Sequence, residues 1–312
     1  MGNLISFMKD VADGLRKSGN FGTAHIYRSS MNAVITFNGS EVLPFRKVTQ
    51  EYLKSFETYL REKDCSWNTV STYMRTLRAV YNRAVDRHIA PYVPHHFRYV
   101  YTGTRADRKR ALDREEMELL LKDLPKHLHQ GSGELRRTRA LFLLMFMFRG
   151  MPFVDLAYLK KSDIVGNVLT YRRRKTGRLL TVTLVPEAVK LIDLYMNTDS
   201  TSSYLFPILN SKEGTEAAYK EYQLALRNFN YQLLQLKQIY GLTSELSSYT
   251  ARHSWATMAY YCEIHPGIIS EAMGHSSITV TETYLKPFKN KKIDEANVTV
   301  LSSLKRVCTF GK

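Results

Sequence analysis

One break in the sequence constrains the fold more than any other feature. Residues 102–110 show neither helical nor strand periodicity. Four of them are basic: Arg105, Arg108, Lys109 and Arg110. A chain of 312 residues is long enough for two domains, each with its own core. We therefore expect this segment to be a basic linker between two domains. An N-terminal extension at residues 1–21 would precede the first domain, and a C-terminal tail at residues 291–312 would follow the second. A solvated loop is the alternative interpretation of the break.

The segment before this break has the pattern of a helical domain over residues 22–101. A first helix is expected at residues 23–37, because it follows a glycine and ends at Asn-Gly. Thr49 and Ser66 are placed to cap two more helices, each with apolar side chains recurring on one face. The exposed surface of the third helix carries two arginines: Arg75 and Arg78.

The segment after the break, residues 111–290, combines helices with a small sheet. A helix is expected to begin after Asp113, a good N-cap, and another helix covers residues 135–149. Residues 168–171 and 179–184 alternate in the manner of strands around a glycine-containing turn, and helical patterns return after them. The predicted fold class is therefore mainly α with a small β-sheet (α+β).

The composition favours a polyanionic partner. Lys and Arg number 45 against 29 acidic residues, which gives a formal net charge of +16. A basic protein binds nucleic acid favourably because each neutralised phosphate releases condensed counterions. An anionic membrane is a less suitable partner, because the longest apolar run, residues 140–148, is too short to cross a bilayer. The three cysteines are widely separated and the N-terminus lacks the pattern of a secretory signal. We expect a cytoplasmic, DNA-facing protein without disulfides.

Three short motifs near the C-terminus carry the residue types needed to cleave a phosphodiester. They are Tyr249-Thr-Ala-Arg252-His253, Met273-Gly-His275 and Thr283-Tyr284. Cleavage without a metal requires a nucleophile, positive donors around the phosphate oxygens and an acid for the leaving oxygen. Tyr284 supplies the nucleophile, Arg252 a bidentate phosphate clamp, and His275 a donor or proton carrier.

Together these motifs resemble the tyrosine recombinase (phage integrase) family. In that family a Gly-His pair follows the arginine by some twenty residues, and the nucleophilic tyrosine follows nine after that histidine. Here Arg252 and His275 are 23 residues apart, and Tyr284 comes nine residues later. The resemblance implies a helical core-binding domain at residues 22–101 and a catalytic domain at residues 111–290.

The resemblance also implies a catalytic lysine on a β-hairpin. Lys175 lies between the two expected strands, where it would protonate the leaving 5′-oxygen. Arg174 and Arg178 lie close to it and are alternatives for this role. The basic residues expected to contact DNA are Arg75, Arg78, Arg105, Arg108, Lys109, Arg110, Arg174 and Arg178.

The first catalytic arginine of the family is missing from this sequence. The motif Arg149-Gly-Met-Pro152-Phe-Val-Asp155-Leu places a proline at its position, and proline cannot clamp a phosphate. On a continuous helix Arg149 would lie one turn before Pro152 on the same face, so we expect Arg149 to replace the missing arginine. A structural role for Arg149 is the alternative, and Arg139 is a less favoured substitute. Asp155 is expected to orient an arginine, and the motif is most similar to integrases of Bacteroides-type mobile elements.

Tyr249 stands where the family has a histidine, three residues before Arg252. A phenol can donate a hydrogen bond to phosphate but is a poor proton shuttle near neutral pH. Phosphate binding and simple aromatic packing are both open for Tyr249. His253 is expected to be a buried neighbour of the site.

The resemblance implies strand exchange through a covalent 3′-phosphotyrosyl intermediate. Because the protein–DNA bond stores the energy of the cleaved phosphodiester, neither ATP nor a metal is needed, and no cofactor is expected. The implied partners are double-stranded DNA recombination sites, further copies of the chain in a tetramer on two sites, and an accessory DNA-bending protein. The tail would dock on a neighbouring protomer or fold back on its own domain. Integration, excision and inversion are all open outcomes.

Other functions remain compatible with the same residues. A catalytically degenerate DNA-binding protein derived from a recombinase is favoured by Pro152 and Tyr249. A type IB topoisomerase-like enzyme would relax supercoils without a preferred site, and the helical domain weighs against it. A metal-dependent nuclease is more remote, because no carboxylate cluster has metal-ligand spacing.

Overall fold

A computed structural model describes residues 2–104, 110–124, 133–285 and 290–305 of the chain. The chain divides into two compact units. The first comprises residues 1–107 together with 211–220, and the second comprises residues 108–210 and 221–312. Each unit is described by itself below.

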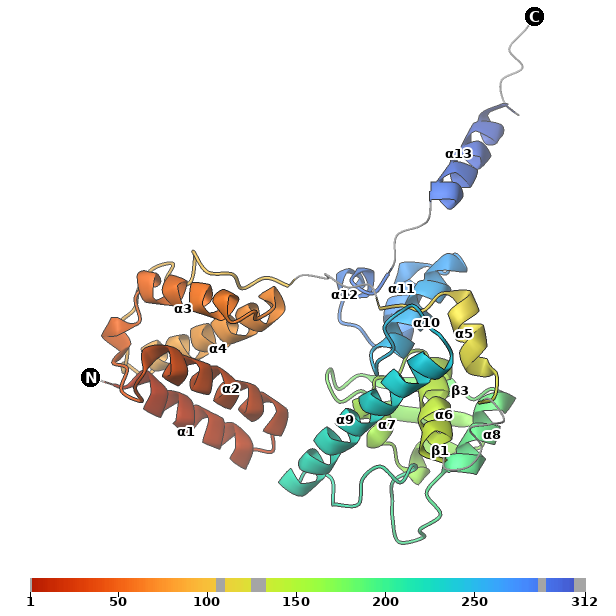
Figure 1. The fold of residues 1–312 in the computed structure, drawn as a ribbon, viewed down its shortest axis with the longest axis horizontal. Coiled ribbons are helices and arrows are strands. Elements are labelled where there is room, and N and C mark those ends of the chain that lie inside the picture. Colours follow the sequence, from red (N-terminus) through yellow and green to blue (C-terminus); the bar gives the residue numbers. More distant parts are fainter. Residues whose placement is uncertain (1, 105–109, 125–132, 286–289, 306–312) are drawn as a thin grey trace, which may run out of the picture. The chain divides into compact units, whose positions relative to one another are not determined.

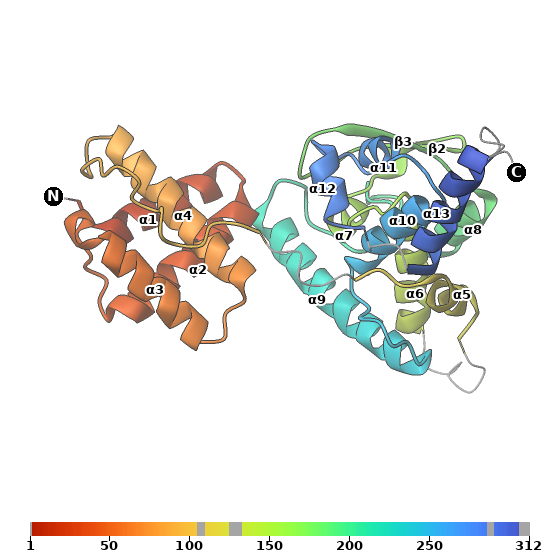
Figure 2. The same ribbon diagram turned by 90° about the horizontal axis from the view of Figure 1, so that it is seen from above.

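The first unit is a bundle of four helices. They are α1 (Leu4–Lys17), α2 (Phe21–Asn38), α3 (Gln50–Glu62) and α4 (Trp67–Asp86), with a 3-10 turn at Phe45–Lys47 before α3. Helix α1 packs against α2 and α4, and α3 packs against α4, as Figures 1 and 2 show. The bundle encloses a single apolar cluster that draws on all four helices.

Local capping explains where these helices begin and end. The Thr49 side chain accepts a hydrogen bond from the backbone of Tyr52, and the Ser66 side chain accepts one from Thr69, each over 3.2 Å. Helix α2 ends at Gly39, whose φ of 68° is left-handed and therefore suits glycine. The predicted starts of α3 and α4 and the predicted end of α2 are confirmed.

The N-terminal segment departs from expectation. Residues 1–21 do not form an extension outside the helical domain, because they contain α1, whose apolar side chains lie in the core of the first unit. The Asn3 side chain caps this helix by accepting from the backbone of Ile5, and it also accepts from the backbone of Leu43. The buried side chains of α1 are Leu4, Ile5, Phe7, Met8, Val11 and Ala12. Their spacing of three and four residues is the helical stripe that the prediction overlooked.

The second unit is mainly helical with one small sheet, which confirms the predicted fold class. Its helices are α5 (Arg114–Leu121), α6 (Gly133–Met147), α7 (Phe153–Ala157), α8 (Pro186–Tyr195), α9 (Glu216–Ile239, whose first turn belongs to the first unit), α10 (Thr250–Tyr261), α11 (Pro266–Ala272), α12 (Ile278–Glu282) and α13 (Asn290–Lys305). A 3-10 turn at Lys161–Asp163 leads into the sheet. Asp113 caps α5 as expected, in a reciprocal pair with Glu116. Among the described residues, no helix combines the length and apolarity needed to cross a membrane.

The sheet is antiparallel in the order β1-β2-β3, with β1 at Ile164–Val165, β2 at Val168–Arg172 and β3 at Leu179–Thr183. Strand β1 has only two residues, which is too short to show the alternating pattern from which a strand can be predicted. In the β2–β3 register Leu169 opposes Val182 and Tyr171 opposes Leu180, and all four side chains are buried. This two-residue alternation turns one face of the hairpin toward the core.

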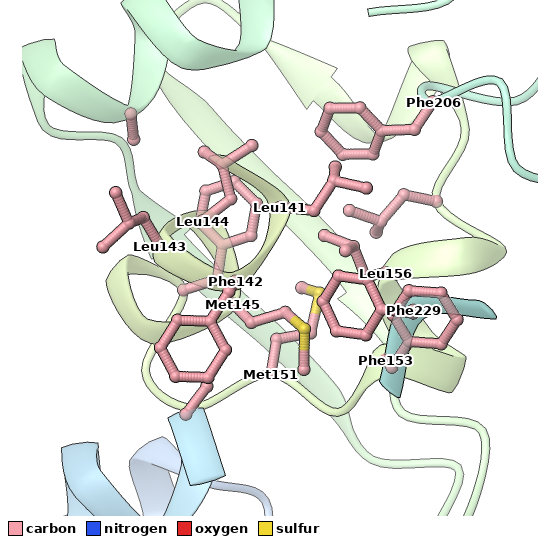
Figure 3. Packing of buried hydrophobic residues seen from close by; sticks show 14 of the residues in the cluster. Leu141, Phe142, Leu143, Leu144, Met145, Met151, Phe153, Leu156, Phe206 and Phe229 are labelled. Carbon is pink, nitrogen blue, oxygen red and sulfur yellow. The ribbon is translucent and has the colours of Figure 1, made fainter. Parts of the chain in front are cut away.

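Helix α6 lies at the centre of the second core. Its residues 141–145 are all apolar and all buried. A helix with apolar side chains on every side is stable only when other elements cover all of its faces. Figure 3 shows these side chains spreading around the helix, with Phe153 and Phe229 beside them. The rings of Phe153 and Phe229 stack with their centroids 4.4 Å apart, which joins α7 to α9.

The end of α6 corrects the sequence-based expectation. The helix was expected to run to residue 149, but it ends at Met147. Arg149 and Gly150 then follow with left-handed φ values of 59° and 71°, and Pro152 is the N-cap of α7. The expectation that Arg149 and Pro152 share a face of one continuous helix is therefore wrong, since a left-handed turn separates them.

Candidate active site

Arg252, in the first turn of α10, is the centre of the site. Its side chain is 2% exposed, and its guanidinium donates to the carbonyl oxygens of Gly150 and Met273, each over 2.7 Å. Gly150 is required here, because a Cβ at this position would lie 2.9 Å from the Arg252 Cα. Burial, followed by the charge of Arg173, lowers the pKa of Arg252 to about 10, so the group remains a cation near neutral pH. The surrounding backbone therefore holds one buried positive charge in a single orientation.

His275 meets the same guanidinium. Its Nε2 lies 2.7 Å from Arg252 Nη2, and its Nδ1 lies 2.8 Å from the Thr281 hydroxyl. A guanidinium only donates, so Nε2 must be the acceptor and Nδ1 must carry the proton. Burial is the main reason that the pKa of His275 falls to about 3, and the charges of Arg252, Arg173 and Lys175 add to it. His275 is therefore neutral across the physiological pH range.

Tyr284 follows α12 by two residues and is half-buried. Its ring stacks on that of His275, with centroids 5.1 Å apart and planes 21° from parallel. The ring of His253, which is half-buried as well, packs against Tyr284 at 4.6 Å. The Arg252 Cζ lies 5.5 Å from the Tyr284 ring centroid. The structure thus brings the expected nucleophile, phosphate clamp and proton carrier together within one chain.

The β2–β3 hairpin borders this group. Lys175 lies in the exposed turn between the strands, and it is one of the charges that lower the pKa of His275. Arg178 donates from Nη1 to the carbonyl oxygen of His275 over 3.0 Å. The Arg174 guanidinium lies 3.8 Å from the centroid of the Tyr158 ring, in a cation–π contact. Lys175, Arg174 and Arg178 are the three candidates for the proton donor in this turn, and the two arginines are each held by a neighbouring group.

Arg173 is a residue of the site that the sequence analysis missed. It is 5% exposed, and its Nη1 donates to the carbonyl oxygens of Met273 and Gly274 over 3.1 and 2.9 Å. These carbonyls directly precede His275, so Arg173 holds the loop that presents the histidine. A signal was present in the sequence, because Arg173 continues the inward register of Leu169 and Tyr171 by two residues.

Asp155 balances part of this charge. It lies in α7, is 3% exposed, and accepts from the backbone of Arg174 over 2.9 Å. Its Oδ2 is 3.9 Å from Arg173 Nε, which agrees with the expectation that Asp155 orients an arginine. Burial is the larger influence on its pKa, which is raised. The Nε atoms of Arg173 and Arg252 are buried without a hydrogen-bond partner. The site thus has more buried cations than anions and has unused donors, which suits an oxyanion.

Arg149 and Tyr249 lie at the edge of the site. Arg149 is half-buried, and its charge acts on the buried phenol of Tyr171 together with those of Arg173 and Arg252. Tyr249 directly precedes α10 and is 57% exposed, so its ring is not a core side chain. The roles predicted for both residues in phosphate binding stay predictions.

The remaining candidates divide by burial. The Arg139 guanidinium donates to the carbonyl oxygens of Leu120 and Leu121, which explains it as a cap for the end of α5. Arg75 and Arg78 are exposed on α4, and Arg110 is exposed before α5. Three residues of the expected basic linker lie outside the described residues: Arg105, Arg108 and Lys109. Within the described residues, no three His, Cys, Asp or Glu side chains gather as a metal ion would require.

Two family models match the chain. A phage integrase SAM-like domain matches residues 3–99, and a model of the phage integrase family matches residues 110–291. Among curated proteins, tyrosine recombinase XerC of Roseiflexus sp. (strain RS-1) is 25% identical over 284 residues, which is 89% of this chain and 87% of the relative. XerC of Rickettsia peacockii (strain Rustic) is 22% identical over 260 residues, covering 81% of each chain.

Solved structures share the fold at lower identity. The Tn1549 transposon integrase in complex with transposon right end DNA superposes with a TM-score of 0.66 and 15% identity, covering 96% of this chain and all of the other. A lambda integrase (75-356) dimer bound to a COC' core site superposes with a TM-score of 0.65 and 17% identity, covering 91% of this chain and 95% of the other.

Proposed function

The chain belongs to the phage integrase family and is a tyrosine recombinase, and on this premise we propose that it cuts and rejoins duplex DNA at specific sites through Tyr284. The observation that carries the proposal is the stacking of the Tyr284 ring on His275, which is hydrogen-bonded to Arg252. A nucleophile, a neutral proton carrier and a cation thereby lie next to one another in one site. Phosphoryl transfer without a bound metal needs these three groups close together.

In the proposed cleavage step the Tyr284 oxygen bonds to phosphorus, and the bond between phosphorus and the 5′-oxygen breaks. The phenol gives up its proton, and the leaving oxygen takes one to become a 5′-hydroxyl. The product is a 3′-phosphotyrosyl link. In the rejoining step a 5′-hydroxyl of the partner strand loses its proton and bonds to this phosphorus, the bond between phosphorus and the Tyr284 oxygen breaks, and the phenol takes up a proton. We assign the phenol proton to His275, whose Nε2 accepts from Arg252 in this structure, so taking up the proton requires that this hydrogen bond be given up.

Lys175 is the acid that we assign to the leaving 5′-oxygen. Its side chain is exposed in the hairpin turn, and its charge reaches His275. Arg174 is engaged with Tyr158 and Arg178 with the His275 carbonyl, so each has a structural partner that would have to be given up. These contacts favour Lys175 over both arginines as the proton donor.

Two arginines are candidates for the charge that Pro152 cannot supply. Arg149 lies at the edge of the site on a left-handed turn, and we retain it as the proposed replacement. Arg173 is the competitor, because it is buried beside Asp155 and its Nε is without a hydrogen-bond partner. Near wild-type cleavage by Arg149→Ala would eliminate the first assignment, and a loss confined to Arg173→Lys would assign the role to Arg173.

We propose that the DNA partner is a double-stranded recombination site bound by several copies of the chain, as in a tetramer on two sites. The exposed basic residues of both units support this: Arg75, Arg78, Arg110, Arg174, Lys175 and Arg178. The lambda integrase structure is a dimer on a DNA core site, which supports oligomers on DNA here. An accessory DNA-bending protein belongs to the same proposal.

Helix α13 is the segment that we propose to join neighbouring protomers. Four of its apolar side chains are exposed: Ile293, Val298, Val300 and Leu301. Near the start of the helix, Lys292 pairs with Glu263 over 2.9 Å. Burying the apolar side chains on a second copy would remove them from water. Deleting residues 290–312 is expected to reduce assembly on DNA while leaving monomer binding, and unchanged assembly would contradict this role.

Covalent capture tests the proposed chemistry. The protein and a Tyr284→Phe control are incubated with fragmented genomic DNA from the source cell, denatured in detergent, and the attached DNA is sequenced. Tyr284-dependent adducts concentrated at one sequence are expected. Adducts scattered over many sequences would instead indicate a topoisomerase-like enzyme.

A DNA-binding protein without catalysis is the second candidate, because Pro152 lacks the family's arginine and Tyr249 stands in place of a histidine. It predicts retention of native DNA with no adduct under denaturing conditions. Repeating the capture with a DNA-bending protein added distinguishes this candidate from a recombinase that needs that partner.

A further inference from the structure

Thr281 links two groups of the site that the proposed mechanism treats separately. Its side chain is fully buried in α12, and its hydroxyl lies 2.8 Å from His275 Nδ1. Its backbone carbonyl accepts from the backbone N–H of Tyr284 over 2.9 Å. We propose that Thr281 is a positioning residue, which holds the neutral His275 ring in one orientation relative to Arg252 and Tyr284. The catalytic part of this inference rests on the proposed function of Tyr284.

The orientation of the imidazole depends on both of its partners. Arg252 points an N–H at Nε2, so a proton on Nε2 would place two hydrogen-bond donors opposite each other with no acceptor between them. The proton must then lie on Nδ1, where the Thr281 oxygen is the acceptor. Rotating the ring by half a turn would replace Nδ1 with a carbon and leave Thr281 without this bond. Arg252 therefore selects the tautomer, and Thr281 secures the ring that carries it.

The cations that act on His275 come from one helix and one hairpin. Arg252 lies on α10, and Arg173 and Lys175 lie on the β2–β3 hairpin. The Tyr284 ring stacks on the His275 ring. Because burial and three cations lower the pKa of His275, its ring stays neutral, and its hydrogen bond to Thr281 is one between uncharged groups. Such a bond orients the ring without changing its charge.

Helix α12 makes this bond relevant to the nucleophile. The helix spans five residues and carries Thr281 three residues before Tyr284. The Thr257 hydroxyl holds the other end of this segment by donating to the Tyr284 carbonyl over 3.2 Å. A shift of α12 that moves Tyr284 would stretch the bond between Thr281 and His275, so the carrier and the nucleophile are positioned through one residue.

Histidine ¹⁵N spectra of the full chain test the orientation without DNA. The protonated nitrogen of His275, assigned by its loss in His275→Asn, is expected to be Nδ1 between about pH 5 and 8. Thr281→Ser keeps the acceptor and should keep this signature. Thr281→Val removes it, and we expect a shifted or exchange-broadened Nδ1 signal. An unchanged His275 spectrum in Thr281→Val would overturn the proposal.

Adduct formation tests whether this orientation matters for cleavage. The probe is a nicked duplex carrying the sequence recovered by covalent capture. Thr281→Val should form the adduct about 10- to 100-fold more slowly. This range is the free-energy cost of leaving a buried hydrogen-bonding group unsatisfied, converted to a ratio of rates. Thr281→Ser should restore the rate to within about threefold of wild type, because the hydroxyl oxygen is retained. A wild-type rate in Thr281→Val would refute the catalytic part.

A matched control separates positioning from stability. Thr138→Val removes another buried threonine hydroxyl in the same unit, in α6. It should leave both the His275 spectrum and the adduct rate unchanged. If it reproduces the effects of Thr281→Val, they arise from general loosening and the proposal fails. If the wild-type chain forms no adduct, the proposed function fails, while the spectra still decide whether Thr281 orients His275.

Discussion

The interior of the first unit and the site around Tyr284 differ in the side chains that they bury. The first unit buries mostly apolar side chains, such as Phe56, Leu53 and Met74. The site instead buries two arginines, Arg173 and Arg252, with one carboxylate and a neutral histidine. Burial of apolar surface stabilises a fold, whereas burial of a charge costs free energy unless hydrogen bonds offset that cost.

The hydrogen bonds of the site explain how the chain tolerates this cost. Arg252 is held by the carbonyls of Gly150 and Met273 and by a histidine nitrogen, and Arg173 is held by the carbonyls of Met273 and Gly274, so the two arginines share the Met273 carbonyl. Carbonyl dipoles compensate a cation without neutralising it, so its charge remains available to a phosphate. The difference teaches that this molecule separates the residues that stabilise it from those proposed to do chemistry. Substitutions in the two regions should therefore have opposite profiles.

The largest effect is expected from Tyr284→Phe. The substitution removes the attacking oxygen, so adduct formation on the recovered site should fall by at least about a thousandfold. The ring and its stacking on His275 are kept, and the midpoint of thermal unfolding should change little. Adducts are counted on a denaturing gel beside a melting curve. Adducts that persist in this variant would remove Tyr284 from the mechanism.

Phe56→Ala should show the reverse profile. Phe56 is fully buried in the first unit, and truncating such a ring costs about 3–5 kcal/mol of unfolding free energy. Urea unfolding measures this loss. Below the unfolding transition the adduct formed per folded molecule should match wild type, because the site around Tyr284 lies in the second unit. A large drop in that ratio would contradict the separation of the two regions.

One buried histidine in each region should make the folded chain less stable at low pH. Burial lowers the pKa of His275 to about 3 and also lowers that of His96 in the first unit. Unfolding restores a pKa of about 6.5, so between these values the unfolded chain binds protons that the folded chain does not. Stability is then complete above about pH 6.5 and declines as the pH falls toward the folded values.

The two histidines can be separated by substitution. Urea midpoints at pH 7 and pH 5 are compared for the wild type, His275→Asn and His96→Asn. Each variant should lose part of the acid sensitivity, and His275→Asn should lose more, because three nearby cations add to the effect of burial on His275. Wild-type acid sensitivity in His275→Asn would show that His275 is not held neutral.

The smallest effects are expected at the surface. Arg75→Ala and Arg78→Ala should each lower the slope of log affinity against log salt by about 1, if each arginine contacts one phosphate. Both side chains are exposed on α4, so the unfolding midpoint should stay unchanged. Arg114→Ala on α5 is the matched control, because Arg114 is exposed and pairs with Glu118. An equal change of slope in the control would make the effect one of net charge alone.

The sequence by itself determined the features that depend on near neighbours in the chain. Caps at Thr49, Ser66 and Asp113 mark helix starts, because a cap bonds within three residues. Alternation revealed the β2–β3 pair, since its register repeats every two residues. The spacing of Arg252, His275 and Tyr284 identified the family through local motifs.

Only the tertiary structure decided how the site around Tyr284 is built. Arg173 is recognised by carbonyls about a hundred residues away in the chain, and Arg252 bonds to Gly150 across a similar distance. The early end of α6 depends on Gly150 packing against the Arg252 backbone. Hydrogen bonds between distant segments leave no periodic trace in a single sequence. Their partners become identifiable when the fold brings those segments within bonding distance.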